Sequence, residues 1–356
     1  MRSRRTLKKT IKKMGILGEG FYGKTYRLNY RSKGYTFYDL VNEPNVNHIE
    51  LYITKSKEHI SYTDKQDIHD FMTFLRNKKD ILAKIYKNVF FMTGKTVSQL
   101  IKEELESNAI ALKCYGKYAE KYLTVAPITG FRNLKIMGAK FTLNYVNTVY
   151  VTFSTECNNK YDMDADKFII DILESLVILQ RAGYQHNDIK LDNIVLCKDR
   201  YKLIDWGVAG YINNNSKIGY ADAKIGDPIT TNPMKWYLMD IPGFASKTIM
   251  KIRALSINYK YEDSKIFQEI YTKINNEFEF VITAIPDKKK LFRMYKNTFD
   301  IFMVGITLIH AIYRYKLEKK KYMPLAEKLF SIINPIRDAK EALHIARTYI
   351  KNYKHN

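Results

Sequence analysis

The residues best suited to chemistry lie in the stretch 185–207, which reads QHNDIKLDNIVLCKDRYKLIDWG. Asp188 and Lys190 fall in a polar loop that Asn193 closes, and two short apolar strands follow, the second of which ends at Asp205. Hard cations take oxygen ligands, so two carboxylates and an amide near strand ends suit a magnesium-bound polyphosphate. A plain surface turn followed by a hairpin is the alternative for this stretch.

A second candidate for phosphate binding is a glycine-rich segment near the N-terminus with the spacing G-x-G-x-x-G. Glycines let the backbone approach phosphates and donate N–H groups to them, and two aromatic side chains at the tip could cover the phosphates. The residues after the last glycine are strand-like, which argues against a dinucleotide-binding fold, where a helix follows. The members of the segment are Gly18, Gly20, Phe21, Tyr22 and Gly23.

A lysine inside an apolar strand is a third candidate. Lys84 lies in the middle of the strand-like run 80–86, and a lysine there is unfavourable unless it is paired. Lys55 is a second possible strand lysine, but a glutamate-rich helix, 96–112, directly follows Lys84 and favours it. The glutamates within reach are Glu103, Glu104 and Glu106, of which we expect Glu106 to form the pair.

Together these segments resemble a protein kinase. HNDIKLDN is similar to the kinase catalytic loop, H-R-D-L-x-x-x-N, and Asp205 followed by Trp206 and Gly207 is similar to D-F-G. The glycine loop, the strand lysine, the helix glutamate and the catalytic loop occur in kinase order. The apolar segment 299–306 resembles the central helix of the large lobe, in which Asp300 would anchor the catalytic-loop backbone. A buried aspartate in an apolar helix also needs N–H partners.

The resemblance implies an α+β, two-lobed protein-kinase fold, with a small β-rich N-lobe that has one main helix and a larger, mostly helical C-lobe. The expected parts are a basic arm at 1–13, an N-lobe at 14–157 with an insertion at about 29–78, and a C-lobe at 158–356 with an extended segment at about 210–297. Lysine, asparagine, isoleucine and tyrosine are abundant, and together with the insertions they resemble divergent kinases of large DNA viruses.

The resemblance also implies a role for each residue of the site. Asp188 would orient and deprotonate the acceptor hydroxyl, and Lys190 would neutralise charge on the transferring phosphoryl group. Asn193 and Asp205 would hold Mg²⁺, with Mn²⁺ as an alternative, and Lys84 would bind the non-transferred phosphates of ATP.

Four further features bear on this interpretation. His186 is expected to support the loop through hydrogen bonds rather than to act as a base. The lysine in Asp188-Ile189-Lys190 is similar to the serine/threonine-specific pattern. Asn187 stands where regulated kinases carry arginine, which predicts activity that does not depend on phosphorylation of the activation segment. The A-P-E that usually ends this segment is replaced by Asn-Pro-Met, so its customary partner, Arg337, lacks a glutamate there.

The composition of the chain indicates which kinds of partner and which location to expect. The 356-residue chain has a formal net charge of +22, which attracts nucleic acid or other acidic partners besides a protein substrate. The three cysteines are far apart, and neither a secretory signal nor a membrane-spanning run is recognised, so we expect an intracellular protein, in the host cytoplasm or the virion if it is viral. The oligomeric state is left open.

Three alternative functions stay open at the level of sequence. A small-molecule kinase of the aminoglycoside or choline type shares the H-x-D and asparagine arrangement, but Lys190 and the Asp300 helix favour a protein kinase. A pseudokinase would lack phosphate- or metal-binding residues, all of which are present here. A nucleic-acid-binding protein would use the positive charge alone.

Overall fold

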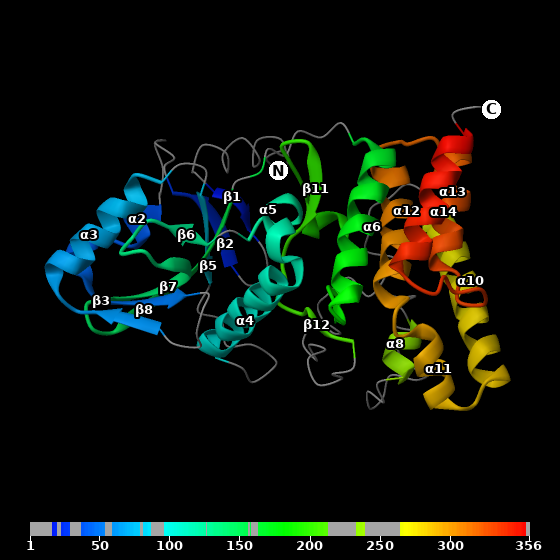
Figure 1. The fold of residues 1–356 in the computed structure, drawn as a ribbon, viewed down its shortest axis with the longest axis horizontal. Helices are drawn as coiled ribbons and strands as arrows, with labels where there is room; N and C mark the ends of the chain where they lie inside the picture. Colours follow the sequence, from blue (N-terminus) through cyan, green and yellow to red (C-terminus); the bar gives the residue numbers. More distant parts are fainter. Residues whose placement is uncertain are drawn as a thin grey trace. The chain divides into compact units, whose positions relative to one another are not determined.

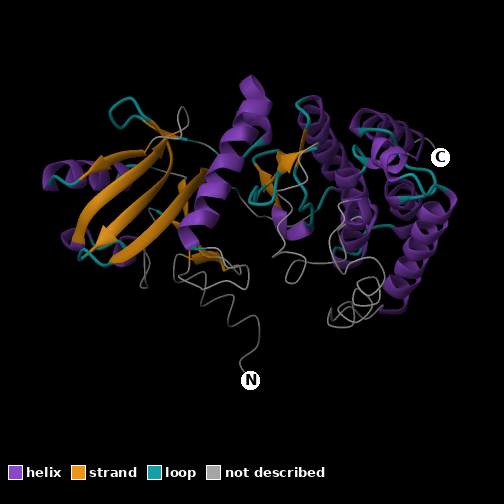
Figure 2. Ribbon diagram, turned by 90° about the horizontal axis from the view of Figure 1, so that it is seen from below, coloured by secondary structure: helices purple, strands orange, loops and turns teal. Residues whose placement is uncertain are grey.

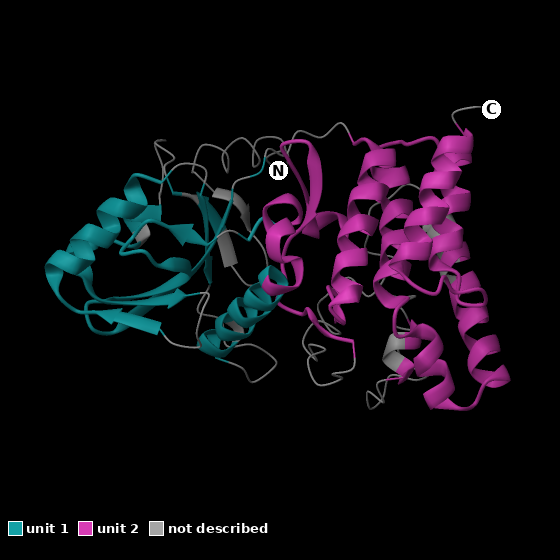
Figure 3. Ribbon diagram, viewed as in Figure 1, with its two compact units in different colours: residues 1–112, 123–158 teal, residues 113–122, 159–356 magenta. Residues whose placement is uncertain are grey.

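The computed structural model describes residues 16–19, 23–28, 37–53, 59–78, 81–86, 96–125, 127–155, 157, 163–212, 233–238 and 264–353. The chain divides into two compact units: unit 1 comprises residues 1–112 and 123–158, and unit 2 comprises 113–122 and 159–356 (Figure 3). The expectations for the basic arm, for Gly20, Phe21 and Tyr22, for Lys55 and for most of the activation segment lie outside the described residues.

Unit 1 is built on an antiparallel sheet with the strand order β1-β2-β5-β8-β7-β3-β4, to which β6 adds by pairing with β7 (Figure 1). Figure 2 shows the strands of this sheet in orange. The strands are β1 (Ile16–Glu19), β2 (Gly23–Arg27), β3 (Val46–Ile53), β4 (His59–Tyr62), β5 (Ile81–Tyr86), β6 (Ile128–Thr129), β7 (Lys135–Leu143) and β8 (Asn147–Thr155). The central strands β7 and β8 contain runs of consecutive buried residues, which lie within the core of unit 1.

The helices of unit 1 are α2 (Phe37–Leu40), the 3-10 turn η1 (Glu43–Asn45), α3 (Lys65–Arg76) and α4 (Val97–Tyr115), whose last three residues belong to unit 2. The side chain of Asp64 caps α3 by accepting the N–H groups of Gln66 and Asp67. The buried residues of α3, at 68, 71, 72 and 75, have the spacing of one helical face.

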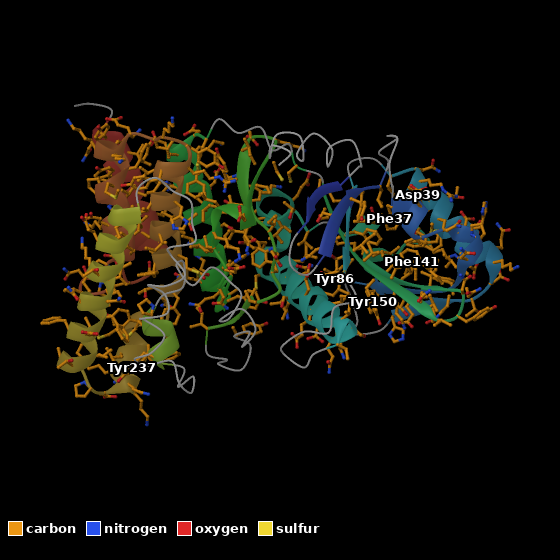
Figure 4. The ribbon with its side chains drawn as sticks, turned by 180° about the vertical axis from the view of Figure 1, so that it is seen from behind. Phe37, Asp39, Tyr86, Phe141, Tyr150 and Tyr237 are labelled. Carbon is orange, nitrogen blue, oxygen red and sulfur yellow. The ribbon has the colours of Figure 1, made fainter. Side chains whose placement is uncertain are left out.

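The segment 29–78, which the sequence suggests is an insertion of unknown role, contributes to the sheet and to its core. Its described part contains β3, β4 and α3, and β3 pairs with β7. Phe37 packs edge-on against Phe141 of β7, with ring centroids 6.1 Å apart (Figure 4). Phe71 of α3 packs against the same ring. Burial of such rings is a large stabilising contribution, so this segment is integral to unit 1.

Unit 2 is mostly helical. Its helices are α5 (Ala119–Tyr122), α6 (Ala165–Arg181), α8 (Pro233–Leu238), α10 (Ser264–Ala284), α11 (Lys288–Tyr295), α12 (Phe299–Arg314), α13 (Lys319–Phe330) and α14 (Ala339–Tyr353), with 3-10 turns η2 (Gly116–Tyr118) and η3 (Leu191–Asn193). Two short antiparallel pairs complete it: β10 (Ile194–Cys197) with β11 (Arg200–Leu203), and β9 (Tyr184–Gln185) with β12 (Gly210–Tyr211).

Helix α12 is the core of unit 2, since every residue from 299 to 312 is buried. A helix that is apolar on all sides must be surrounded by other elements. Helix α6 ends where Gly183 adopts a φ of +68°, a conformation that favours glycine. The described residues therefore form a mixed α+β protein with one large antiparallel sheet and several helices.

Candidate active site

The stretch rich in potential catalytic residues forms a loop and a hairpin in unit 2. Strands β10 and β11 pair with Ile194 opposite Leu203, and Lys198 makes the turn at a φ of +56°. The N–H of Ile204 donates to the carbonyl of Asn193 at 2.9 Å. The two open ends of the hairpin therefore lie side by side, which brings the backbone of Asn193 next to the residue before Asp205.

The side chain of Asp188 is held by two of the residues that the sequence selects. Lys190 Nζ lies 3.0 and 2.8 Å from the two carboxylate oxygens of Asp188. Asn193 Nδ2 donates to Asp188 Oδ2 at 2.6 Å and to the Asp188 carbonyl at 2.9 Å. Charge-assisted hydrogen bonds of this kind fix the direction of a carboxylate.

The loop backbone is anchored to α12 by Asp300, whose side chain is buried. Asp300 Oδ2 accepts the N–H of His186 at 2.8 Å, and Oδ1 accepts the N–H of Asn187 at 3.0 Å. These are the N–H partners that an aspartate in an apolar helix needs, as expected from the sequence. The anchored residues immediately precede Asp188, so the position of the carboxylate depends on α12.

His186 uses both ring nitrogens inside the loop. Its Nδ1 accepts the N–H of Asp188 at 3.3 Å, and because a backbone N–H can only donate, Nε2 carries the proton and donates to the Ile204 carbonyl at 3.1 Å. Burial lowers the pKa of His186, against the opposing influence of Asp300. The ring packs edge-on against Trp206 at 4.6 Å between centroids. This neutral imidazole supports the loop and is not placed as a base.

Asn187 and Asp205 share an unusual backbone conformation, with φ values of +68° and +64°. Asparagine and aspartate enter this left-handed region more readily than most residues. The Asn187 side chain donates from Nδ2 to the carbonyl of Val208 at 3.0 Å. Val208 follows Gly207, and β12 then pairs with β9, so the chain just after Asp205 is held to the catalytic loop.

In unit 1, Lys84 on β5 is paired with a glutamate of α4. The partner is Glu104, whose Oε2 lies 3.0 Å from Lys84 Nζ, and the hydroxyl of Tyr86 donates to the same oxygen. Burial, and next the charge of Glu104, raises the pKa of Tyr86, which keeps its hydroxyl protonated as a donor. Figure 4 labels Tyr86, the last residue of β5. The preference for Glu106 is thus corrected to Glu104.

Helical spacing explains this correction. Glu104 is buried and falls on the same face of α4 as the buried residues Ile101 and Asn108, three and four positions away. Glu106 lies outside that set and is half-buried. The apolar spacing of α4 could have selected Glu104 from the sequence, had the glutamates been ranked by face.

The site residues predicted from the sequence lie partly in unit 1 and partly in unit 2. Gly18 and Gly23 of the glycine-rich segment lie in β1 and β2, which pair antiparallel with Gly18 opposite Thr25. They and Lys84 belong to unit 1, whereas Asp188, Lys190, Asn193, Asp205 and Asp300 belong to unit 2. Arg337, for which the sequence leaves no partner, pairs with Glu341 four residues later, with Nε 3.2 Å from Oε2.

The donor set at the loop 186–193 fits a hard divalent cation. Asn193 directs its amide nitrogen at Asp188, which leaves its Oδ1 oxygen as the group able to bind a cation, and Asp205 would add a carboxylate. In the described part of the chain, no cluster of three or more His, Cys, Asp or Glu residues could hold a metal. Magnesium in phosphoryl-transfer sites is usually bound through one or two carboxylates together with substrate phosphates, so two protein oxygens suffice.

None of the helices in the described ranges combines the length and hydropathy that a membrane span requires.

Comparison with known proteins agrees with the chemistry of the loop. No protein-family model matches the chain. Among curated proteins, it is similar to the probable serine/threonine-protein kinase fnkE of Dictyostelium discoideum, with 26% identity over 156 residues. The match covers 39% of this chain but only 12% of the relative. The chain therefore has a distant, protein kinase-like relationship.

Proposed function

We propose that this chain is a serine/threonine protein kinase, which transfers the γ-phosphoryl group of ATP to protein hydroxyl groups in the presence of Mg²⁺. The observation that carries the proposal is the geometry of Asp188. Its carboxylate is held by Lys190 and Asn193, in a loop whose backbone is fixed by the buried Asp300. An aspartate, a lysine and an asparagine with these mutual contacts match the needs of phosphoryl transfer to an alcohol.

In the proposed reaction, Asp188 accepts the proton of the acceptor hydroxyl as the oxygen attacks the γ-phosphorus. Lys190 lies against Asp188 and offsets negative charge on the transferring group. Lys84, paired with Glu104, binds the non-transferred phosphates. Asn193 and Asp205 would hold the Mg²⁺ ion, which neutralises phosphate charge when it is bound.

Two finer features of the proposal rest on the loop. Lys190 favours serine and threonine acceptors by its resemblance to the serine/threonine-specific pattern. Asn187 replaces the arginine of regulated kinases and bonds Val208 directly, so the start of the activation segment is held without a phosphate. We therefore propose activity that is independent of phosphorylation in this segment. An intracellular site of action, and a viral source, remain proposals from the sequence.

Independence from phosphorylation is tested by replacing every hydroxyl-bearing residue between Gly207 and Thr231. The positions are Tyr211, Ser216, Tyr220, Thr230 and Thr231. The combined variant, with phenylalanine for tyrosine and alanine for serine and threonine, should keep most of the wild-type rate. Loss of activity would show that phosphorylation of this segment is required.

The function itself is tested by incubating purified protein with γ-labelled ATP, Mg²⁺ and a protein substrate such as casein, beside Asp188→Asn and Asp205→Asn. Label should appear on phosphoserine or phosphothreonine and disappear in both variants. Equal label in the variants would contradict the proposal. Label on small alcohols such as choline or an aminoglycoside, and none on protein, would replace it with a small-molecule kinase.

A further inference from the structure

Helix α12 contacts the catalytic loop through three side chains spaced seven residues apart, Asp300, Thr307 and Arg314. Asp300 accepts two N–H groups at the start of the loop, at 2.8 and 3.0 Å. The Thr307 hydroxyl donates to the carbonyl of Ile189 at 3.0 Å, and both residues are fully buried. The Arg314 guanidinium donates to the carboxylate of Asp192 at 3.3 Å.

The spacing of these contacts has a geometric reason. Seven residues of α-helix make about two turns and rise about 10 Å, so the three side chains fall on one face. The contacts along the loop follow in chain order, from the two residues before Asp188 to Ile189 and then to Asp192.

Thr307 is an unexpected residue at the centre of an apolar helix. Threonine is a weaker helix former than leucine or alanine, and in a helix its hydroxyl often bonds the carbonyl of its own preceding turn. Here the hydroxyl bonds the loop, while the adjacent Ile306 and Leu308 are buried apolar residues. Without this donor, the Ile189 carbonyl would lose its partner in a buried setting.

We propose that Thr307 is a positioning residue for Asp188. This inference rests on the proposed kinase function. Asp300 fixes the N–H groups of the two residues before Asp188, and Thr307 fixes the carbonyl of the residue after it, so the backbone of Asp188 lies between two fixed points on one rigid helix. The Arg314–Asp192 pair is a weaker third contact, because both side chains are exposed, at 42% and 79%.

The test compares Thr307→Val, which has nearly the same shape but no hydroxyl, with Thr307→Ser, which keeps the hydroxyl. A small displacement of a catalytic group can lower the rate strongly, so kcat of Thr307→Val should fall about 10-fold while KM for ATP stays within about 2-fold. Thr307→Ser should recover most of the rate. Ile309→Val is the matched control, since Ile309 is equally buried in α12, and its kcat should stay within about 2-fold of the wild type.

A second measurement does not depend on activity. Hydrogen exchange of the amides of residues 188–190 should be faster in Thr307→Val than in the wild type, and unchanged in Ile309→Val. If the wild type transfers no phosphate, the proposed function is wrong. The hydrogen-exchange comparison then tests by itself whether Thr307 positions the backbone of Asp188. An active wild type with unchanged kcat in Thr307→Val, no recovery in Thr307→Ser, or an equal loss in Ile309→Val would overturn the inference.

Discussion

Each unit holds a lysine against a carboxylate, and the two pairs are built in different ways. In unit 1, Lys84 and Glu104 come from a strand and a helix, 3.0 Å apart, and the side chain of Glu104 is only 11% exposed. In unit 2, Lys190 and Asp188 are neighbours in one loop, 2.8 Å apart and both about one-quarter exposed, at 23% and 26%. The first pair is part of the packing of unit 1, whereas the second rests on a loop that α12 holds by other contacts.

This difference predicts which substitutions will change the stability of the fold and which will change the reaction. Removing a charge from the Lys84–Glu104 pair leaves the other charge partly buried, so the fold of unit 1 should respond. Removing a charge from the loop leaves its backbone anchored through Asp300 and Thr307. Changes in the loop should therefore alter the reaction more than the fold.

The first predicted effect, and one of the two largest, is expected at Asp205. Asparagine tolerates the φ of +64° found there and keeps one oxygen, but it lacks the negative charge that would hold Mg²⁺. Asp205→Asn should lower kcat by about 100-fold or more and raise the Mg²⁺ concentration required, measured as initial rates against Mg²⁺. A rate within a few-fold of the wild type at all Mg²⁺ concentrations would show that Asp205 does not bind Mg²⁺ in the reaction.

The next effect is expected at Glu104. Glu104→Gln keeps the shape but removes the charge that faces Lys84, so the free energy of unfolding should fall by about 1–3 kcal/mol, and KM for ATP should rise about 10-fold. Denaturant unfolding and ATP titration measure both quantities. Glu106→Gln is the control on the same helix and should have the smaller effect on both. A larger effect of Glu106→Gln than of Glu104→Gln on both quantities would instead identify Glu106 as the partner of Lys84.

A smaller effect is expected from pH through His186. Burial lowers its pKa in the folded state below the value of about 6.5 in the unfolded chain. The unfolded state therefore binds more protons as the pH falls below about 6.5, so the stability that the neutral ring contributes is complete above that pH and declines below it. Unfolding measured at pH 7.5 and 5.5 should show a larger loss for the wild type than for His186→Gln. Equal losses would argue against a buried neutral ring.

The smallest effect is expected at Arg337. Its side chain is 83% exposed and pairs with Glu341, four residues away. The N–H and the guanidinium of Arg337 lower the pKa of Glu341, but exposed pairs of this kind contribute little. Arg337→Ala should leave the melting temperature unchanged, whereas Arg200→Ala should lower it, because Arg200 bridges the largely buried Asp171 and Glu174. A large loss at Arg337 would indicate an additional partner.

The sequence predicted those parts of the site that follow from strong local constraints. Asp300 was recognised by its resemblance to the aspartate of the central kinase helix, and its need for N–H partners in an apolar helix supported that assignment. The short polar loop before the strands placed Asp188 and Asn193 near each other. The helix α12 followed from the resemblance of the apolar segment 299–306 to the central helix of the kinase large lobe.

The rest depended on tertiary contacts that no local pattern specifies. Thr307 looks like any threonine in a helix until its partner is known, and the partner lies 118 residues away in sequence. The segment containing β3 and β4 could not be placed, because β3 pairs with β7, which lies far later in the chain. Pairing across such separations is set by the whole fold rather than by neighbouring residues.

The most direct test of the central claim is the behaviour of Asp188→Asn, measured for both rate and stability. The variant removes a proton acceptor but keeps the shape of the side chain and an oxygen for Asn193. Loss of a general base accounts for about 100- to 10,000-fold in rate, so kcat for phosphate transfer to serine or threonine should fall into that range. The melting temperature should stay near that of the wild type. A rate close to wild type, or a loss explained by unfolding, would contradict the assignment of Asp188 as the catalytic base.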